Sequence, residues 1–204
     1  MNREVFKSSN VLLIFSLALT VLYSGCVQMS EIIYDQTAGM NGGFEVVQEG
    51  LPVNWLVYTP NTIPTGEYDL IIDTTRYKDG KQSLHFRVRE CSPNGGWSSP
   101  GLCQEYYAIP GETYKFSCWI LNNGCDFFLQ IGGVSAFDGK YDTIIKSNEK
   151  IDTWQHFAYQ YQMPAEDKFN RIRFELNVLS PGRFWIDNIR IEDMDGNIVI
   201  PASE

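Results

Sequence analysis

The stretch PGRFWIDNIRIED, residues 181–193, alternates apolar and polar residues as a β-strand does, but a polar pair breaks the alternation. Phe184 and Ile186 precede the break, and two more isoleucines follow it. The break is Asp187-Asn188, and a carboxylate beside a hydrophobic core costs free energy unless something satisfies its charge. The stretch therefore predicts a strand with one buried face and a dedicated partner for Asp187.

The same alternation recurs in SLHFRV (83–88), YKFSCWI (114–120) and RIRFELNV (171–178). Each run sends one set of side chains to a core and the other set, such as His85, to water. Glycine and proline turns separate the runs, and no segment after the first residues has a helical period. Many short strands of this kind predict an all-β fold, a jelly-roll β-sandwich of two antiparallel sheets.

The chain begins with a basic, then apolar segment that is too short to span a bilayer comfortably. It ends at Ser24-Gly25-Cys26, which resembles a bacterial lipoprotein signal with the cysteine as the lipidated residue, although Tyr23 stands where leucine is usual. An ordinary secretory signal and an uncleaved anchor remain alternatives. All three place the rest of the chain outside the cytoplasm. The lipoprotein signal further predicts the cell envelope, at the outer membrane or cell surface, with lipid as the only membrane contact. The expected division is a signal peptide (1–25), a spacer (26–40), one domain (41–195) and a C-terminal tail (196–204).

Composition argues against two classes of function. Acidic residues outnumber basic ones, 25 to 16, and no Lys/Arg run occurs, so nucleic acid is not expected as a partner. No serine-nucleophile elbow, zinc-protease motif or phosphate-binding loop is present in the sequence. The chain is therefore not expected to be an enzyme, although two acids facing each other across a cleft would suit a glycosidase.

Four cysteines follow Cys26, and an even number in an exported chain favours disulfides over free thiols. Short loops close most easily, so the preferred pairs are Cys91–Cys103 and Cys118–Cys125. A zinc site is the alternative, although the spacings fit no common zinc pattern.

Several pieces of the chain together resemble carbohydrate-binding modules of families four, nine and twenty-two, which are galactose-binding-like jelly rolls. In order they are NGGFE (41–45), PVNW (52–55), YKDGKQSLHF (77–86), IPGETYKFSCWI (109–120), DTWQHFAYQYQMP (152–164) and FWIDNIRIED (184–193). The resemblance covers nearly all of the expected domain. It implies this jelly roll and non-catalytic binding of a polysaccharide or oligosaccharide, with fold implied more strongly than function.

The resemblance also implies a structural calcium ion between the first and last strands. Calcium prefers carboxylate and carbonyl oxygens, and Glu45 and Asp187 match the carboxylate positions. Backbone carbonyls would come from the turn around Asp79 to Ser83, with Gly43 as a further candidate. The alternative is that Asp187 caps a turn or accepts backbone N–H bonds while Glu45 lies in water.

Sugars stack on exposed aromatic rings beside hydrogen-bonding side chains, so a sugar site is expected on the polar strand faces. If Asn122-Asn123-Gly124 forms a short hairpin loop, Trp119 lies opposite Phe127 on one face. The alternative is that a loop covers Trp119 or that it joins a second core. Trp97, in the loop between Cys91 and Cys103, is either a ligand clamp or a small hydrophobic plug. The expected site comprises Trp119, Phe127, Trp97, Arg87, Gln130, Arg173, Glu175 and Asn177.

A second function stays open from the sequence alone. A sandwich of this kind that has lost sugar binding is typical of a structural or protein-interaction subunit in a cell-surface complex. An exposed concave aromatic face favours sugar binding, and a flat apolar patch without polar neighbours favours a protein partner.

Overall fold

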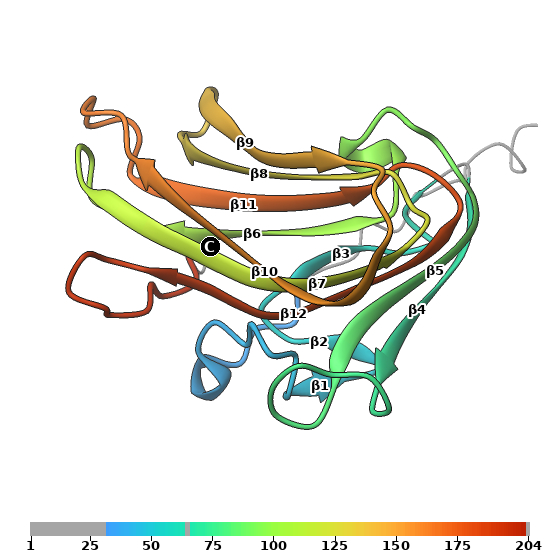
Figure 1. Ribbon diagram of the computed structural model, residues 1–204. Helices are drawn as coiled ribbons and strands as arrows, with labels where there is room; N and C mark the ends of the chain where they lie inside the picture. Colours follow the sequence, from blue (N-terminus) through green and yellow to red (C-terminus); the bar gives the residue numbers. More distant parts are fainter. Residues whose placement is uncertain (1–31, 64–65, 203–204) are drawn as a thin grey trace, which may run out of the picture.

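A computed structural model describes residues 32–63 and 66–202. Two five-stranded antiparallel sheets form a sandwich, and Figure 1 shows them as two layers, one above the other. We call the sheet of order β3-β6-β11-β8-β9 the β11 sheet, and the sheet of order β10-β7-β12-β5-β4 the β12 sheet. The predicted all-β jelly roll is confirmed.

The strands of the β11 sheet are β3 (Leu56–Tyr58), β6 (Gly101–Tyr107), β11 (Arg171–Val178), β8 (Phe127–Val134) and β9 (Gly139–Ser147). Those of the β12 sheet are β10 (Ile151–Gln162), β7 (Thr113–Asn123), β12 (Gly182–Glu192), β5 (Ser83–Cys91) and β4 (Gly66–Asp73). Two short strands, β1 (Val47–Gln48) and β2 (Leu51–Pro52), form a small hairpin, and short 3-10 helices lie at η1 (Gln36–Ala38) and η2 (Gly96–Ser98). No helix in the described ranges has the length and apolar character needed to cross a membrane.

The core lies between the two sheets and is built from the alternating residues of each strand. In β11 every second residue, from Ile172 to Val178, is fully buried. The predicted inner faces of β5 and β7 are buried as well, from Leu84 to Val88 and from Tyr114 to Ile120. Period-two alternation therefore positions the core, and it leaves the other face of each sheet to carry polar groups.

The break in the opening stretch is a β-bulge. The register of β12 against β7 shifts between Asp187 and Arg190, and Asn188 has a left-handed φ of 48°. The bulge returns Ile189 to the core, where it is 2% exposed. Gly42 passes so close to Ile189 that a Cβ on it would lie 1.8 Å from the Ile189 carbonyl oxygen. The polar pair thus bends the strand without removing its apolar residues from the core.

Segments outside the predicted limits of 41 and 195 also pack on the sandwich. Asn54 donates from its side-chain amide to the carbonyls of Asp35 and Gly39. Near the other end of the chain, Tyr106 bridges to Pro201, and Ala202 is buried. The described part of the predicted spacer and the predicted tail therefore belong to the folded domain, while the predicted signal peptide and Cys26 lie outside the described residues.

Candidate functional site

The outer face of the β11 sheet carries an unusual density of charged side chains. Arg171, Arg173, Glu175 and Asn177 alternate with the buried residues of β11 and therefore point away from the core. The antiparallel register places Glu175 between Cys103 of β6 and Gln130 of β8. Three adjacent strands thus bring polar side chains to one central point on this face.

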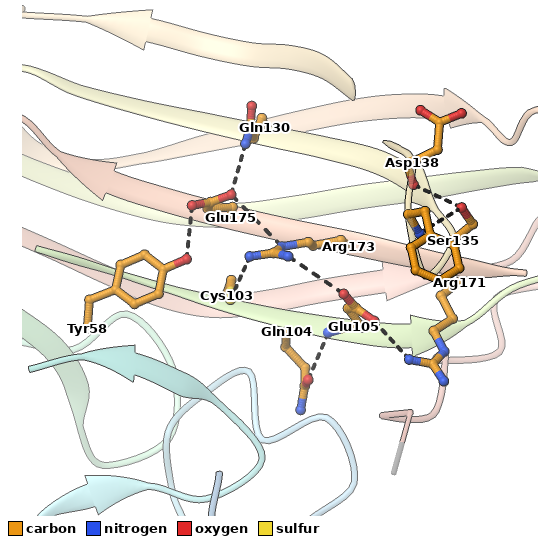
Figure 2. A network of polar contacts seen from close by, with 11 residues as sticks. Tyr58, Cys103, Gln104, Glu105, Gln130, Ser135, Asp138, Arg171, Arg173 and Glu175 are labelled. Atoms are coloured by element: carbon orange, nitrogen blue, oxygen red, sulfur yellow. Dashed lines mark hydrogen bonds and ion pairs between the residues drawn. The ribbon is translucent and has the colours of Figure 1, made fainter. Parts of the chain in front are cut away.

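Glu175 is the centre of a hydrogen-bonded network (Figure 2). Its Oε1 accepts a hydrogen bond of 3.0 Å from the Tyr58 hydroxyl, and its Oε2 accepts one of 2.9 Å from Gln130 Nε2. Arg173 Nε lies 3.9 Å from the same Oε2. Because Glu175 is only 6% exposed, these neighbours hold its carboxylate in a fixed orientation.

The guanidinium groups on this face are matched by carboxylates. Arg173 Nη2 approaches Cys103 Sγ at 3.5 Å, and its Nη1 lies 3.7 Å from Glu105 Oε1. Arg171 Nη1 donates to Glu105 Oε2 at 3.2 Å. Two arginines and two glutamates therefore share the centre of the face, and their charges balance.

Trp97 covers one side of the network. Its ring lies over Tyr58 with 4.8 Å between ring centroids, and 45% of the residue is exposed. Burial, followed by the nearby Cys103 and Glu175, raises the pKa of Tyr58 above its usual range, so the phenol stays protonated and donates to Glu175. Trp97 thus presents an accessible aromatic face directly above a fixed polar pair.

Asn177 positions the loop that carries Trp97. Its side-chain oxygen accepts from Gly96 N at 2.9 Å, and its side-chain amide donates to Gly96 O at 3.1 Å. Gly95 has a φ of 75° and approaches the Phe128 ring, so this turn needs a residue without a Cβ. Asn177 is fully buried and therefore supports the loop from below; the prediction that it faces a ligand is wrong.

A second exposed ring lies on the same face of the sheet, at the edge opposite Trp97. Tyr141 of β9 is 41% exposed and pairs with Gly132 of β8. A Cβ on Gly132 would lie 2.4 Å from the Tyr141 ring, so the glycine makes room for it. Burial raises the pKa of Tyr141, and Arg173 and Glu175 are among the charges that act on it. Trp97 and Tyr141 therefore flank the charged network.

Four of the predicted site residues come together here: Trp97, Gln130, Arg173 and Glu175. Sequence reasoning missed Tyr58, Cys103, Glu105 and Tyr141. The stretch GLCQEYY in β6 does not signal Cys103 and Glu105, since polar Gln104 takes a buried position and Cys103 is itself buried. Tyr58 lies in a three-residue strand, which is too short to show a period.

The predicted Trp119–Phe127 platform is wrong. The residues between β7 and β8 form a crossover from the β12 sheet to the β11 sheet, not a hairpin loop. Phe127 is therefore fully buried in the core, where its ring packs on Phe184 at 4.8 Å. Trp119 lies on the outer face of the β12 sheet, beneath the Lys78 ammonium, whose nitrogen is 4.0 Å from the ring centroid.

Arg87 is also misplaced by the sequence prediction. It lies on β5 in the β12 sheet and pairs with Asp69 of β4 at 2.6 Å. This sheet is the opposite layer of the sandwich, so Arg87 does not join Arg173. An exposed polar strand face does not reveal from sequence which sheet it belongs to.

The two carboxylates predicted for calcium meet the same turn. Asp187 Oδ2 accepts hydrogen bonds from Lys78 N (2.6 Å) and Asp79 N (3.0 Å), and its Oδ1 accepts from Asn188 N (2.7 Å). Glu45 Oε1 accepts from Lys81 N at 2.8 Å. Burial raises the pKa of Asp187 to about 6 despite the three N–H donors. The turn thus joins the start of the domain to its last strand.

The other residues predicted for calcium lie around this turn. Asp79 accepts from Gly80 N, the Ser83 hydroxyl donates to Arg76 O, and Gly43 lies beside the Glu45 side chain. Among the described residues no three His, Cys, Asp or Glu side chains gather as a metal site. A calcium site here therefore depends on two carboxylates completed by carbonyl oxygens.

Neither predicted disulfide is present, since Cys91, Cys103, Cys118 and Cys125 are all free thiols. Cys103 faces outward beside Arg173, whereas Cys91 ends β5 in the opposite sheet. Cys118 is fully buried on the inner face of β7, whereas Cys125 follows β7 in the crossover. Proximity in sequence did not predict which cysteines lie close together. Cys91 and Cys103 lie in opposite sheets, and Cys118 lies within β7 whereas Cys125 lies beyond its end.

The fold and this aromatic-flanked polar face agree with a match between the chain and a known family. Residues 39–182, well over half of the chain, match the family model of a carbohydrate binding domain that joins types 4 and 9. The chain belongs to this family. The function predicted from the sequence, non-catalytic carbohydrate binding, is therefore confirmed at the level of the family.

Solved structures give the same fold. The domain superposes with a TM-score of 0.51 on the second family-22 xylan-binding domain of Xyn10C from Paenibacillus barcinonensis, at 14% identity over 76% of this chain and 97% of that one. It is also similar to Clostridium thermocellum xylanase Xyn10B complexed with xylohexaose (TM-score 0.50, 18% identity, 68% of this chain, 26% of that chain). Tailspike protein 4 of bacteriophage CBA120 gives a TM-score of 0.53 at 16% identity, over 81% of this chain and 22% of that one. No curated protein matches the chain.

Proposed function

We propose that this carbohydrate binding domain holds a neutral, linear polysaccharide of the xylan type along the outer face of the β11 sheet. The structural neighbours named for xylan and xylohexaose support this choice of ligand. Balanced charge on the face supports a neutral ligand, because Arg171 and Arg173 are matched by Glu105 and Glu175.

The observation that carries the proposal is the Trp97–Tyr58–Glu175 arrangement. A sugar ring stacks its C–H groups on the exposed indole, while fixed polar groups below it bind the hydroxyls. Glu175, Gln130 and Arg173 are already oriented by one another, so little conformational freedom is lost on binding. Tyr141 provides a second stacking surface for another unit of the same chain.

Isothermal titration of the full chain, in detergent, with xylohexaose, cellohexaose and mannohexaose tests the proposal. Trp97→Ala is expected to lower the affinity for the bound hexaose at least tenfold, because the stacking surface is lost. Trp119→Ala is the matched control, since it removes an indole from the opposite sheet, and it should leave the affinity unchanged. Binding that survives Trp97→Ala but not Trp119→Ala would contradict the proposed face, and wild-type silence towards all three sugars would contradict the proposed ligand.

We also propose that calcium binds beside the turn of residues 78–82. The supporting observation is that Asp187 is fully buried and, within the described part of the chain, forms no ion pair that would balance its charge. The carboxylate oxygens of Glu45 and Asp187 face the same turn, and calcium prefers such ligands; carbonyl oxygens would have to complete the set. The ion would hold the turn and the β12 bulge together.

The cellular location is proposed from the sequence alone. We propose that the first 25 residues are a lipoprotein signal and that acylated Cys26 anchors the domain to the cell envelope, at the outer membrane or cell surface. Metabolic labelling with a fatty-acid analogue, compared between wild type and Cys26→Ser, tests this. Label that persists in the variant would contradict it.

A second candidate function rests on an exposed apolar patch formed by Ile109, Met194, Ile198 and Ile200, which are 46–70% exposed. Apolar side chains of this size gathered on a surface are typical of contacts with a protein partner. Such a contact would dock the domain in a cell-surface complex. Crosslinking in cells, with wild type compared to Ile200→Asp, distinguishes this role from the glycan site, which the variant should leave intact.

A further inference from the structure

Two of the four free cysteines lie at the same end of the sandwich, although they belong to different elements. Cys91 is the last residue of β5, and Cys125 lies in the crossover that leads from β7 to β8. Both pack against the hydrophobic core. Neither was predicted to pair with the other, because a long stretch of sequence separates them.

Cys91 and the residue that follows Cys125 both contact the end of β11. Cys91 Sγ lies 3.8 Å from the Val178 carbonyl oxygen. Leu179, the next residue, donates from its backbone N–H to Asp126 O at 2.7 Å, and Asp126 directly follows Cys125. Cys91 therefore meets the carbonyl group of the Val178–Leu179 peptide unit, and the residue next to Cys125 meets its N–H group.

The Cys125 side chain packs against β12, the strand that lies next to β5. A Cβ on Gly182 of β12 would be 2.7 Å from Cys125 Sγ, so the sulfur lies directly over this glycine. Gly182 is paired with Val88 of β5, three residues before Cys91. The Cys125 sulfur therefore lies over β12 at the position where this strand pairs with the last part of β5.

The electrostatics agree with this proximity. Burial raises the pKa of Cys91 to about 11 and that of Cys125 to about 12, and the Asp126 carboxylate adds to both shifts. Cys91 itself contributes to the raised pKa of Cys125. Each thiol is therefore within electrostatic range of the same carboxylate, and both are weak nucleophiles once the domain has folded.

We propose that Cys91 and Cys125 form an intramolecular disulfide when the chain folds in the presence of a disulfide oxidant. The Cys91 thiolate attacks one sulfur of the external disulfide, which forms a mixed disulfide and releases one thiol. The Cys125 thiolate then attacks the Cys91 sulfur and releases the second thiol, each protein thiol having lost its proton to solvent. The two protein thiols are oxidised, and the external disulfide is reduced to two thiols.

The positions of the other two cysteines exclude them from this bond. Cys103 faces outward on the β11 sheet, beside Arg173. Cys118 is fully buried between the sheets, on the inner face of β7. Both should stay reduced.

The bond would act on the region that carries the proposed sugar contacts. Cys91 begins the loop that holds Trp97, and Cys125 anchors the crossover that enters the β11 sheet. A disulfide closing the loop of residues 91–125 would raise the melting temperature by roughly 10 °C.

Peptide mapping tests the pairing in the full chain with Cys26→Ser, so that this residue does not enter the thiol count. The protein is unfolded in denaturant, refolded in a mixture of reduced and oxidised glutathione, alkylated, and digested with chymotrypsin. Cleavage after Trp97, Tyr107 and Trp119 separates all four cysteines into different peptides. We expect a linked Cys91–Cys125 pair, with alkylated Cys103 and Cys118. Any other linkage, or alkylation of all four, would overturn the proposal.

Thermal unfolding gives an independent measurement. The oxidised protein should lose about 10 °C in melting temperature when a reductant is added, and Cys91→Ala or Cys125→Ala should abolish this loss. Cys103→Ala is the matched control and should keep it. A reductant effect that persists in Cys125→Ala would count against the pair even if a linked peptide is found.

Discussion

His85 lies on the outer face of the β12 sheet, where alternation predicts a solvated residue, yet only 7% of it is exposed. Its ring stacks on the Trp185 ring with 4.0 Å between centroids. The guanidinium carbon of Arg76 also lies over the Trp185 ring, 5.0 Å from its centroid. Within the described residues, His85 Nε2 has no hydrogen-bond partner. Burial lowers the pKa of His85 from 6.5 to about 4, because the charged imidazole would lose its hydration.

This lowered pKa predicts a loss of stability in acid. Above pH 6.5 the imidazole is neutral in both states, so it contributes no pH dependence. Between pH 6.5 and 4 the unfolded chain binds a proton that the folded chain does not bind, so the free energy of unfolding falls as the pH falls. The loss levels off below pH 4 at about 3 kcal/mol. Urea unfolding at pH 7 and pH 4 measures it.

His85→Phe keeps the stacking surface but removes the titration, so its free energy of unfolding should depend less on pH in this window. His156→Phe is the matched control, since His156 is the other histidine of the chain and is exposed. Equal pH dependence in wild type and His85→Phe would show that the ring is accessible to protons in the folded state.

Tyr58→Phe tests how firmly the polar network is held. Removing the hydroxyl leaves Glu175 Oε1 without its buried donor, which should lower the free energy of unfolding by about 1–3 kcal/mol and weaken sugar binding. Tyr141→Phe removes a hydroxyl from a residue that is 41% exposed and should change stability by less than about 0.5 kcal/mol. Equal stability of Tyr58→Phe and Tyr141→Phe, measured by urea unfolding, would contradict a structural role for the hydrogen bond.

Residue-scale predictions from the sequence succeeded where alternation alone decides the outcome. Arg173 and Glu175 point outward because their neighbours in β11 must be buried. Trp119 also points outward, as predicted, but alternation does not say which sheet its strand joins. Tyr58 and Tyr141 belong to the site because β3 and β9 lie in the same sheet as β11. The order of strands in a sheet depends on long-range pairing, which a local sequence pattern does not reveal.

At the scale of elements, the crossover between β7 and β8 explains most of the errors. Asn122 holds this connection, because its side chain accepts from Cys125 N at 3.0 Å and donates to Cys125 O and Glu149 O. The sequence Asn122-Asn123-Gly124 is typical of a tight turn, and it is equally typical of a hairpin loop. The pattern therefore located the strand ends correctly but did not determine which strands pair.

The β12 bulge supports a prediction at the same scale. Gly42→Ala would place a methyl group 1.8 Å from the Ile189 carbonyl oxygen, and Ile189 N already donates to Gly42 O at 2.9 Å. Because backbone must move, the free energy of unfolding should fall by about 2–4 kcal/mol. Chemical denaturation measures the change.

Gly43→Ala is the adjacent control for this substitution. A Cβ there would meet its nearest neighbour, Glu45 Cγ, at an ordinary 3.7 Å. Its stability should stay close to that of wild type. A Gly42→Ala protein as stable as Gly43→Ala would mean that the bulge and the N-terminal segment separate without cost.

For the whole molecule, the proposed calcium ion would join the start of the domain, the 78–82 turn and the last strand. Ligand binding to the folded state alone stabilises it, so calcium at about one hundred times its dissociation constant should raise the melting temperature by roughly 5–10 °C, and chelator should reverse this. Asp187→Asn should abolish the response, whereas Asp69→Asn, whose carboxylate pairs with surface arginines, should keep it. A melting temperature indifferent to both calcium and chelator would exclude the ion.

The order of sequence pieces was enough to predict the jelly roll, because each piece fixes one strand or turn of a shared arrangement. The disulfide pairs were not predictable in the same way. Cys91 and Cys125 reach the same end of the sandwich only after both sheets are assembled, when Cys91 lies beside Val178 and Cys125 lies over Gly182.

The half-exposed indole above Tyr58 gives the domain an optical sensor of its own. Of the five tryptophans, Trp97 is the most exposed, whereas Trp55 and Trp185 are almost completely buried. Iodide should therefore quench mainly the long-wavelength part of the emission. A sugar that settles on this ring should shift the emission to the blue and protect it from iodide, so occupancy can be followed without a label.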